Sequence, residues 1–298
     1  MTENIIDTTE QSVVSDFTSI GEIVNQALKK GQNEIKINNG ISTGFTVLDK
    51  EISGFKNGQL NTISVKPGMG KTALLLSIAS NLSIKRNHSI AIFSLERNKQ
   101  KITNRIIESE TGLSVNNVVN RKFEASYEDH LQTLLSNIAK ADIFIDDKAV
   151  LSHNEICTKA TELKRSNNIE LIIIDYLELL VDNIVDKDAR EKQLKIIMQS
   201  LNLLAKELNI PFLLFSQYNS LPEDFETKKK PSLNLLPEYI SDFSDVVIFL
   251  HRSDLYSKPN GNNSHTHTVE LVVSKFGNML EPKYIPLKYI DSIAKFIE

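Results

Sequence analysis

The sequence predicts an α/β fold: a mostly parallel, twisted sheet flanked by helices, with an antiparallel edge. Apolar runs alternate with helical patterns along most of the chain, and such alternation is typical of parallel βαβ units. The last three apolar runs have no long helix between them, which favours antiparallel pairing. The 298 residues are 41% hydrophobic and 24% charged, as in globular proteins that bury a full core.

The parallel part begins at about residue 42 and consists of five apolar runs with helical patterns between them. The runs are 60–65, 89–94, 142–146, 171–175 and 211–216. The helical patterns are 71–82, 98–110, 152–164 and 190–208. Ser152 and Glu155 have capping-box spacing, which predicts that the third helix begins there. Runs 246–251, 269–274 and 284–289 follow and form the predicted antiparallel edge.

The first 40 residues differ from the rest. Residues 1–15 are polar and lack periodicity, so we expect a disordered start and no signal peptide. Residues 17–30 predict an amphipathic helix, with Ser19 and Glu22 in capping-box spacing. Its apolar stripe consists of Phe17, Ile20, Ile23, Val24 and Leu28. A linker follows, so the expected organisation is a disordered segment (1–15), a linker helix and linker (16–40) and one domain (41–298).

Composition excludes several classes of protein. The net charge of −4 argues against coating of DNA by bulk positive charge, although it leaves room for a local basic channel. The single cysteine, Cys157, excludes a disulfide framework and a multi-cysteine zinc site. No apolar run reaches the ~18 residues that span a bilayer, so we expect a cytoplasmic protein and no membrane partner. His265 and His267 alternate at the start of a predicted strand. They are either a pair of metal ligands or, more simply, two exposed side chains.

A phosphate-binding loop follows the first predicted strand and opens the first helix. Gly70, Lys71 and Thr72 match the second half of the G-x-x-x-x-G-K-[ST] pattern, whereas Val65 replaces its first glycine. The residues predicted to bind nucleotide are Pro67, Gly68, Met69, Gly70, Lys71 and Thr72. Backbone N–H groups at a helix N-terminus suit phosphate, Lys71 would contact the β- and γ-phosphates, and the Thr72 hydroxyl would bind Mg²⁺. The loop therefore predicts a bound nucleotide with Mg²⁺.

Three more polar side chains lie at or just beyond the ends of apolar strands. Asp175 is the predicted Mg²⁺ ligand, Glu96 the predicted general base that holds the attacking water, and Gln217 an amide that senses the γ-phosphate. Ligands of open α/β sheets bind at the carboxyl ends of the strands. We therefore expect Lys71, Glu96, Asp175 and Gln217 to converge on one site.

The chain resembles the ATPase domain of bacterial replicative DNA helicases of the DnaB type, which has a RecA-like P-loop NTPase fold. The resemblance covers about residues 17–290, with its motifs in the family's order. They are Ser42-Thr43-Gly44-Phe45 with Leu48-Asp49, Pro67-Gly68-Met69-Gly70-Lys71-Thr72, Phe93-Ser94-Leu95-Glu96, Ile145-Asp146-Asp147, Ile174-Asp175-Tyr176-Leu177, Leu204-Ala205-Lys206-Glu207-Leu208-Asn209 with Pro211, and Ser216-Gln217. The family's P-loop also lacks the first glycine.

The resemblance implies an ATP hydrolase acting in DNA replication as a ring. It assigns Glu96 as catalytic base, Asp175 as Mg²⁺ acid and Gln217 as γ-phosphate sensor, and Arg190 matches an Arg before the family's long helix. It implies a homo-hexamer or a mixed ring with another helicase, and single-stranded DNA, a helicase loader or a primase as further partners. The predicted helix 17–30 resembles the linker helix that docks on the next subunit, with packing on its own domain as the alternative. The family's N-terminal helical domain is expected to be absent.

Three departures from the family bear on activity. The arginine finger, which acts on the neighbouring subunit's ATP, corresponds to Gly277. Lys275, which keeps the family's lysine, is the predicted nucleotide-binding cation in its place, although an ammonium lacks the bidentate geometry of a guanidinium. The counterpart of the DNA-binding loop, residues 231–242, contains no Lys, Arg or Gly. The Lys228, Lys229 and Lys230 run just upstream is either a DNA contact or a solvated loop. The family's glutamine in the I-D-Y-L-Q pattern is Glu178, facing either the phosphates and DNA or solvent.

Two functions of different classes follow. The first is an ATP-driven, ring-forming DNA helicase or translocase, favoured by Lys71, Thr72, Glu96, Asp175 and Gln217 together. The second is an ATP-binding regulator that docks on a replicative helicase or its loader with little motor activity, favoured by the departures. A recombination-type or clock-type ATPase matches the fold but fewer of the motifs.

Overall fold

The computed structural model describes residues 20, 40–181, 184–218, 230–256, 265–279 and 281–298. Residues 39–298 form one compact unit. The predicted disordered start and nearly all of the predicted helix 17–30 lie outside the described residues. Their organisation therefore stays a prediction.

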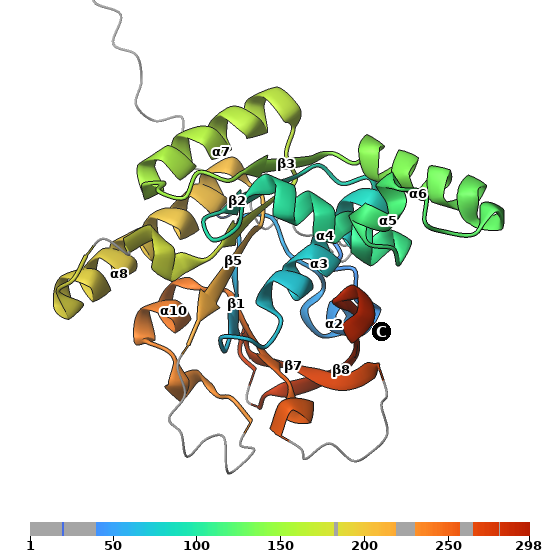
Figure 1. Cartoon of the computed structure of the whole chain (residues 1–298). Helices are drawn as coiled ribbons and strands as arrows, with labels where there is room; N and C mark the ends of the chain where they lie inside the picture. Colours follow the sequence, from blue (N-terminus) through green and yellow to red (C-terminus); the bar gives the residue numbers. More distant parts are fainter. Residues whose placement is uncertain (1–19, 21–39, 182–183, 219–229, 257–264, 280) are drawn as a thin grey trace, which may run out of the picture. The chain divides into compact units, whose positions relative to one another are not determined.

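A nine-stranded sheet runs through the middle of this unit in the order β3-β2-β4-β5-β1-β6-β7-β8-β9 (Figure 1). The strands are β1 (Leu60–Val65), β2 (Ile90–Ser94), β3 (Ile143–Asp146), β4 (Leu171–Asp175), β5 (Phe212–Gln217), β6 (Val246–His251), β7 (Thr266–Phe276), β8 (Lys283–Ile290) and β9 (Lys295–Ile297). Strands β1 to β6 pair in parallel and β6 to β9 pair antiparallel, so the predicted sheet is confirmed. One detail differs: β6 is antiparallel to β7 but parallel to β1, so it joins the two parts of the sheet.

Helices cover both faces of the parallel part (Figure 1). They are α2 (Thr46–Ile52), α3 (Lys71–Arg86), α4 (Lys99–Thr111), α5 (Val115–Val119), α6 (Glu128–Lys140), α7 (His153–Asn167), α8 (Lys187–Leu208) and α10 (Glu238–Phe243). The predicted capping box is present, since the Ser152 hydroxyl accepts from Glu155 N and the Glu155 carboxylate accepts from Ser152 N. Helix α3 runs past its predicted end to Arg86, where Asn87 ends it in the left-handed conformation with φ 59°.

Two apolar cores lie on the two faces of the sheet, and β4 contributes to both. Leu171 and Ile173 belong to the core beneath α2, α3 and α4, whereas Ile172 and Ile174 belong to the core beneath α7, α8 and α10. Successive side chains of a strand point to opposite faces, so a strand buried on both faces needs an unbroken apolar run. Because these strands pair in parallel, their carboxyl ends lie at one edge of the sheet.

The last strand, β9, was not predicted. It pairs with β8 and packs against α3, where Phe296 N donates to the Ser77 hydroxyl over 2.9 Å. The flanking Lys295 forms a largely buried ion pair with Glu110 of α4, with 2.8 Å between Nζ and Oε1. Strand β9 thus connects α3, the helix that follows the P-loop, to the antiparallel edge of the sheet.

Across the part of the chain that the structure describes, no helix has the length and apolarity that a membrane span requires. Nor do any three His, Cys, Asp or Glu side chains gather as metal ligands among those residues. His267 lies 2.5 Å from an Asp291 carboxylate oxygen through its Nε2.

Candidate nucleotide-binding active site

The P-loop joins the end of β1 to the start of α3. Gly68 and Gly70 adopt φ values of 80° and 100°, which residues with a side chain rarely adopt. Gly70 is the N-cap residue of α3, and its carbonyl accepts from Leu74 N over 2.9 Å. The unpaired N–H groups of the first helical turn therefore face the loop, as phosphate binding requires.

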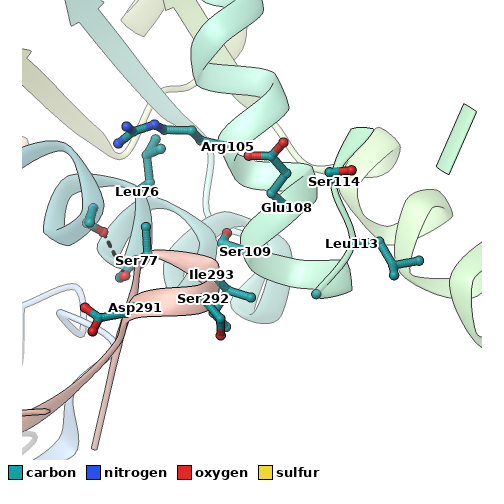
Figure 2. A pocket seen from close by; sticks show the side chains of 13 residues that line it. Leu76, Ser77, Arg105, Glu108, Ser109, Leu113, Ser114, Asp291, Ser292 and Ile293 are labelled. Carbon is teal, nitrogen blue, oxygen red and sulfur yellow. Dashed lines mark hydrogen bonds between the residues drawn. The ribbon is translucent and has the colours of Figure 1, made fainter. Parts of the chain in front are cut away.

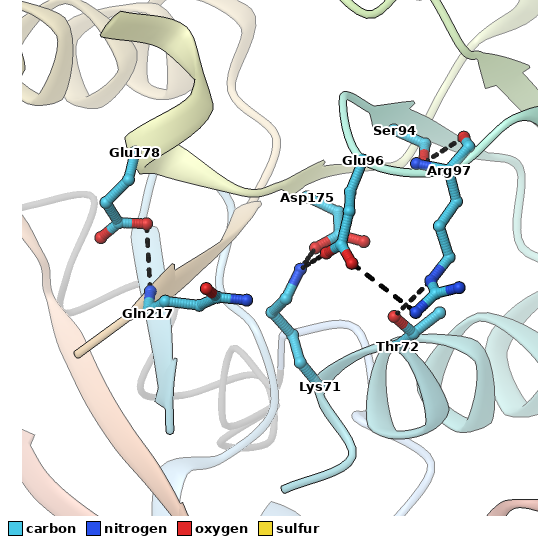
Figure 3. A network of polar contacts seen from close by, with 8 residues as sticks. All are labelled: Lys71, Thr72, Ser94, Glu96, Arg97, Asp175, Glu178 and Gln217. Carbon is cyan, nitrogen blue, oxygen red and sulfur yellow. Dashed lines mark hydrogen bonds and ion pairs between the residues drawn. The ribbon is translucent and has the colours of Figure 1, made fainter. Parts of the chain in front are cut away.

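Lys71 reaches the two acids that the sequence predicted for the site (Figure 3). Its ammonium contacts the Asp175 carboxylate and lies 2.8 Å from Glu96 Oε2. It also lies 4.0 Å from the centre of the Tyr176 ring. Lys71 and Asp175 are only 6% and 2% exposed, whereas Glu96 is 34% exposed, so Glu96 is the acid that water can reach.

The sheet register explains this convergence. Ser94 of β2 pairs with Asp175 of β4, and Val65 of β1 pairs with Gln217 of β5. Since β2, β4, β5 and β1 are neighbours in that order, their carboxyl ends form one continuous edge. The structure therefore brings together Lys71, Glu96, Asp175 and Gln217.

Asp175 and Thr72 provide oxygen ligands that suit Mg²⁺. Burial raises the pKa of the Asp175 carboxyl, and the adjoining Lys71 ammonium offsets part of that rise. A hydroxyl and a carboxylate beside a phosphate site are the donor set that Mg²⁺ takes from P-loop proteins. The residues present therefore fit the predicted metal.

The partly buried Glu178 side chain turns toward the end of β5. Its carboxylate accepts from the Ser216 hydroxyl over 2.5 Å and from Gln217 N over 3.0 Å. Burial is the main cause that raises the pKa of this carboxyl. Arg190 NH2 donates to the Glu178 carbonyl over 3.1 Å, which gives this arginine a structural contact. The sequence did not predict that β5 would offer Glu178 two donors, and the place of this carboxylate relative to phosphates or DNA stays a prediction.

A pocket of about 260 Å³ lies over the P-loop. It is lined by Gly68, Gly70, Lys71, Thr72, Ala73, Glu96, Arg97, Arg105, Gln217, Tyr289 and Ala294. Pro67 and Met69 complete the loop without lining this space. Arg97, Arg105 and Tyr289 were not predicted from the sequence. Only Arg97 carried a signal, its position directly after Glu96 at a strand tip.

A second pocket, of about 290 Å³, adjoins the first along α3 and α4 (Figure 2). Both are lined by Ala73, Arg105 and Ala294. Glu108 and Asp291 add carboxylates to its rim. The pocket at the P-loop therefore has a neighbouring pocket with charged residues in its walls.

The remaining predicted cations make contacts elsewhere. Lys275, on β7, donates to the Ser241 and Ser244 carbonyls at the end of α10 and does not line the pocket of its own chain. Lys230 lies 2.9 Å from Glu270 Oε1, with its ammonium 3.9 Å from the Tyr284 ring centre. Lys228 and Lys229 lie outside the described residues. Both described lysines thus have partners within the chain.

The segment of residues 231–242 packs part of its apolar side chains against the protein. Leu236, Tyr239 and Ile240 are buried in the core beneath α8 and α10. Burial is the main cause that raises the pKa of the Tyr239 hydroxyl to about 12. The apolar residues that replace a basic loop here are therefore core residues.

Comparison with known proteins gives matches over the same residues. A family model described as "DnaB-like helicase C terminal domain" matches residues 40–298. The replicative DNA helicase DnaB of Geobacillus stearothermophilus is 33% identical over 260 residues, which are 87% of this chain and 56% of that protein. The replicative DNA helicase DnaC of Bacillus subtilis (strain 168) is 29% identical over 300 residues, 99% of this chain and 65% of that protein. The chain thus spans less than two thirds of the length of these two relatives.

Two solved structures are similar over nearly the whole chain. The ATPase domain of G40P aligns with a TM-score of 0.80 and 27% identity, covering 95% of this chain and 99% of that one. A DnaB-like replicative helicase, solved in a study of its interactions with primase, aligns with a TM-score of 0.77 and 27% identity, covering 95% and 67%. The fold expectation, a RecA-like ATPase domain, is confirmed.

Proposed function

This chain belongs to the family of DnaB-like helicase C-terminal domains, and we propose that it hydrolyses ATP to drive translocation along DNA during replication. The observation that supports this most is the cluster at the sheet edge, where Lys71 lies between Asp175 and Glu96 beside Gln217. A nucleoside triphosphate bound at the P-loop would give all four of these groups a common function. A structural role alone would not require a lysine, two carboxylates and an amide at adjacent strand ends.

The residues divide the work of hydrolysis between them. Lys71 binds the phosphates together with the α3 N-terminus, and Gln217 hydrogen-bonds the γ-phosphate. Glu96, the more exposed acid, takes a proton from the water that attacks the γ-phosphorus. Thr72 and Asp175 would hold Mg²⁺, which neutralises phosphate charge when bound.

Assembly and partners follow from the family. We propose that the chain acts in a ring, as a homo-hexamer or together with another helicase, and that residues 17–30 dock on the next subunit. One structural relative was solved in a study of its interactions with primase. A primase is therefore a candidate partner, beside a helicase loader. Single-stranded DNA is the proposed track, with Lys228, Lys229 and Lys230 as its candidate contacts.

A second function is favoured by two observations. Gly277 stands where the family has its finger, and residues 231–242 bury apolar side chains instead of offering cations. A subunit of this kind would bind ATP, join or dock on a replicative helicase or its loader, and turn over little ATP. Such a protein would be an ATP-binding regulator.

Steady-state ATP hydrolysis with and without single-stranded DNA separates the two functions. The motor predicts turnover that DNA stimulates and that Glu96→Gln abolishes while ATP binding is kept. ATP binding without turnover in both conditions would instead favour the regulator.

Replacing Lys228, Lys229 and Lys230 by alanine should also flatten the salt dependence of DNA binding, because each phosphate contact releases counterions. An unchanged slope would remove these lysines from the proposed interface.

A further inference from the structure

Arg97 occupies the ATP pocket of its own chain. Its Nε donates to the Thr72 hydroxyl over 3.2 Å, and its NH2 lies 3.6 Å from Glu96 Oε1 (Figure 3). Its side chain is 31% exposed, so the guanidinium is neither buried in the core nor free in solvent. Together with Lys71, Thr72 and Gln217 it lines the space in which a triphosphate would lie.

The backbone of Arg97 is held on both sides. The buried Ser94 hydroxyl donates to the Arg97 carbonyl over 2.8 Å and accepts from Arg97 N over 3.3 Å. The next residue, Asn98, caps α4 by accepting from Lys101 N over 2.9 Å. The side chain therefore starts from a fixed point between the tip of β2 and the start of α4. A donor whose backbone is held in place needs less reorganisation before it stabilises charge in the transition state.

The present acceptor of Arg97 is a group that the nucleotide would engage. Thr72 is a proposed Mg²⁺ ligand, and Glu96 is the proposed base. Once the nucleotide and its metal engage Thr72, the guanidinium loses that acceptor inside the pocket. The oxygens of the terminal phosphate are then acceptors of the geometry that an arginine fork fits.

We propose that Arg97 is a catalytic residue that supplies, within its own chain, the positive charge needed for phosphoryl transfer. The water oxygen bonds to the γ-phosphorus while the bond from that phosphorus to the β–γ bridging oxygen breaks. The water proton goes to Glu96, and the electron pair of the broken bond leaves with ADP, so the products are ADP and phosphate. Arg97 offsets charge on the transferring phosphoryl group. P-loop enzymes take such an arginine in cis or from a neighbour.

Two residues of the antiparallel edge favour a positive charge that comes from the same chain as the ATP site. Gly277 has no side chain to offer a neighbour, and the Lys275 ammonium donates to the main-chain carbonyls of Ser241 and Ser244 at the end of α10. Arg97 needs no second subunit to reach its own pocket. This inference rests on the proposed ATP hydrolysis and adds where the charge comes from.

The first experiment compares kcat and KM of the full chain with those of Arg97→Ala, Arg97→Lys and the matched control Arg165→Ala. Arg165 is exposed on α7, outside both pockets. We expect Arg97→Ala to lower kcat roughly 10²–10³-fold, the effect of removing one preorganised donor, with a much smaller change in KM. Arg97→Lys should recover only part of the loss, because an ammonium lacks the fork. Arg165→Ala should match the wild type.

A binding measurement gives a readout that does not need turnover. ADP with aluminium fluoride mimics the transferring phosphoryl group, whereas ADP alone does not. Arg97→Ala should lose affinity for the fluoride complex by a factor close to its loss in kcat and keep its affinity for ADP. Equal losses for both ligands would overturn the inference, since Arg97 would then only hold the site together.

Mixing inactive variants distinguishes cis from trans. If Arg97 acted on a neighbour's ATP, mixing Arg97→Ala with Glu96→Gln would create interfaces with both groups intact and restore turnover. We expect no restoration. Restored turnover, or an Arg97→Ala rate equal to or above the wild-type rate, overturns the inference and leaves the proposed function standing. A wild-type chain that binds ATP without turnover overturns both, because a site with its charge in cis should hydrolyse ATP alone.

Discussion

The ring of Phe296 lies against Gly70, the last residue of the P-loop before α3. A Cβ placed on Gly70 would come within 3.2 Å of Phe296 Cζ, and Phe296 is fully buried. Strand β9 thereby supports the loop from below, through a residue more than two hundred positions away in sequence. Packing at β9 is therefore expected to influence nucleotide binding as well as stability.

Phe296→Ala tests that support. Removing a fully buried phenylalanine costs about 3–5 kcal/mol of unfolding free energy, and the cavity would lie directly beneath Gly70. We expect urea unfolding to show this loss and ATP affinity to fall, while Phe296→Leu should lose much less of both. A destabilised Phe296→Ala protein with wild-type ATP affinity would show that the ring supports the core alone.

The Lys295–Glu110 ion pair, which joins β9 to α4, gives a second prediction. Its side chains are 11% and 8% exposed, so removing one partner leaves a charge with little solvent. We expect Lys295→Met to lower the unfolding free energy by about 3–5 kcal/mol and the double variant Lys295→Met with Glu110→Leu to recover most of that loss. Urea denaturation of the single and double variants measures both. A double variant as unstable as the single one would contradict this account.

The sequence predicted the parallel strands because each is an apolar run, which in β1, β2, β4, β5 and β6 is buried on both faces and in the edge strand β3 is partly buried. It failed for β9, where Lys295-Phe296-Ile297 is too short to show a pattern and is buried by Ser77 and Glu110 from distant helices. It predicted Lys71, Glu96, Asp175 and Gln217 because strand ends mark the site. It did not predict the contacts of Arg97 and Glu178, since sequence does not say which way a side chain beyond a strand tip turns.

Asp175→Asn separates phosphate binding from metal binding. The change removes a negative charge beside the phosphates and keeps the side chain's size, so ATP binding in the presence of a chelator should stay the same or tighten. The tightening that Mg²⁺ gives the wild type should be lost, together with turnover. Titration of ATP with and without Mg²⁺ measures this, with the exposed Asp142→Asn as control. Retained Mg²⁺-dependent tightening would remove Asp175 from the metal site.

Glu178→Gln is expected to change how stability depends on pH. The pKa of Glu178 is raised above its ordinary 4.5 by burial, so the native state holds a proton that the unfolded state has already lost. The stability contributed by Glu178 is therefore fully present below that ordinary value and is lost as pH rises through the folded pKa. Glutamine cannot ionise, but its carbonyl can accept from Gln217 N and its amide can donate to the Ser216 hydroxyl.

Urea unfolding from pH 4 to 8 should thus show Glu178→Gln gaining on the wild type as pH rises, by at most about 1.4 kcal/mol per pH unit for one proton. Glu155→Gln is a control of opposite sign. The hydrogen bond from Lys148, with those from Ser152, lowers the pKa of Glu155 to about 2, so its contribution is present above its ordinary value and lost only in acid. That variant should be less stable than the wild type at neutral pH and approach it only as the pH falls from 4.5 toward about 2, so the curves of this control are extended to that pH. Parallel stability curves for Glu178→Gln and the wild type would mean that Glu178 stays ionised beside Ser216 and Gln217 throughout the range.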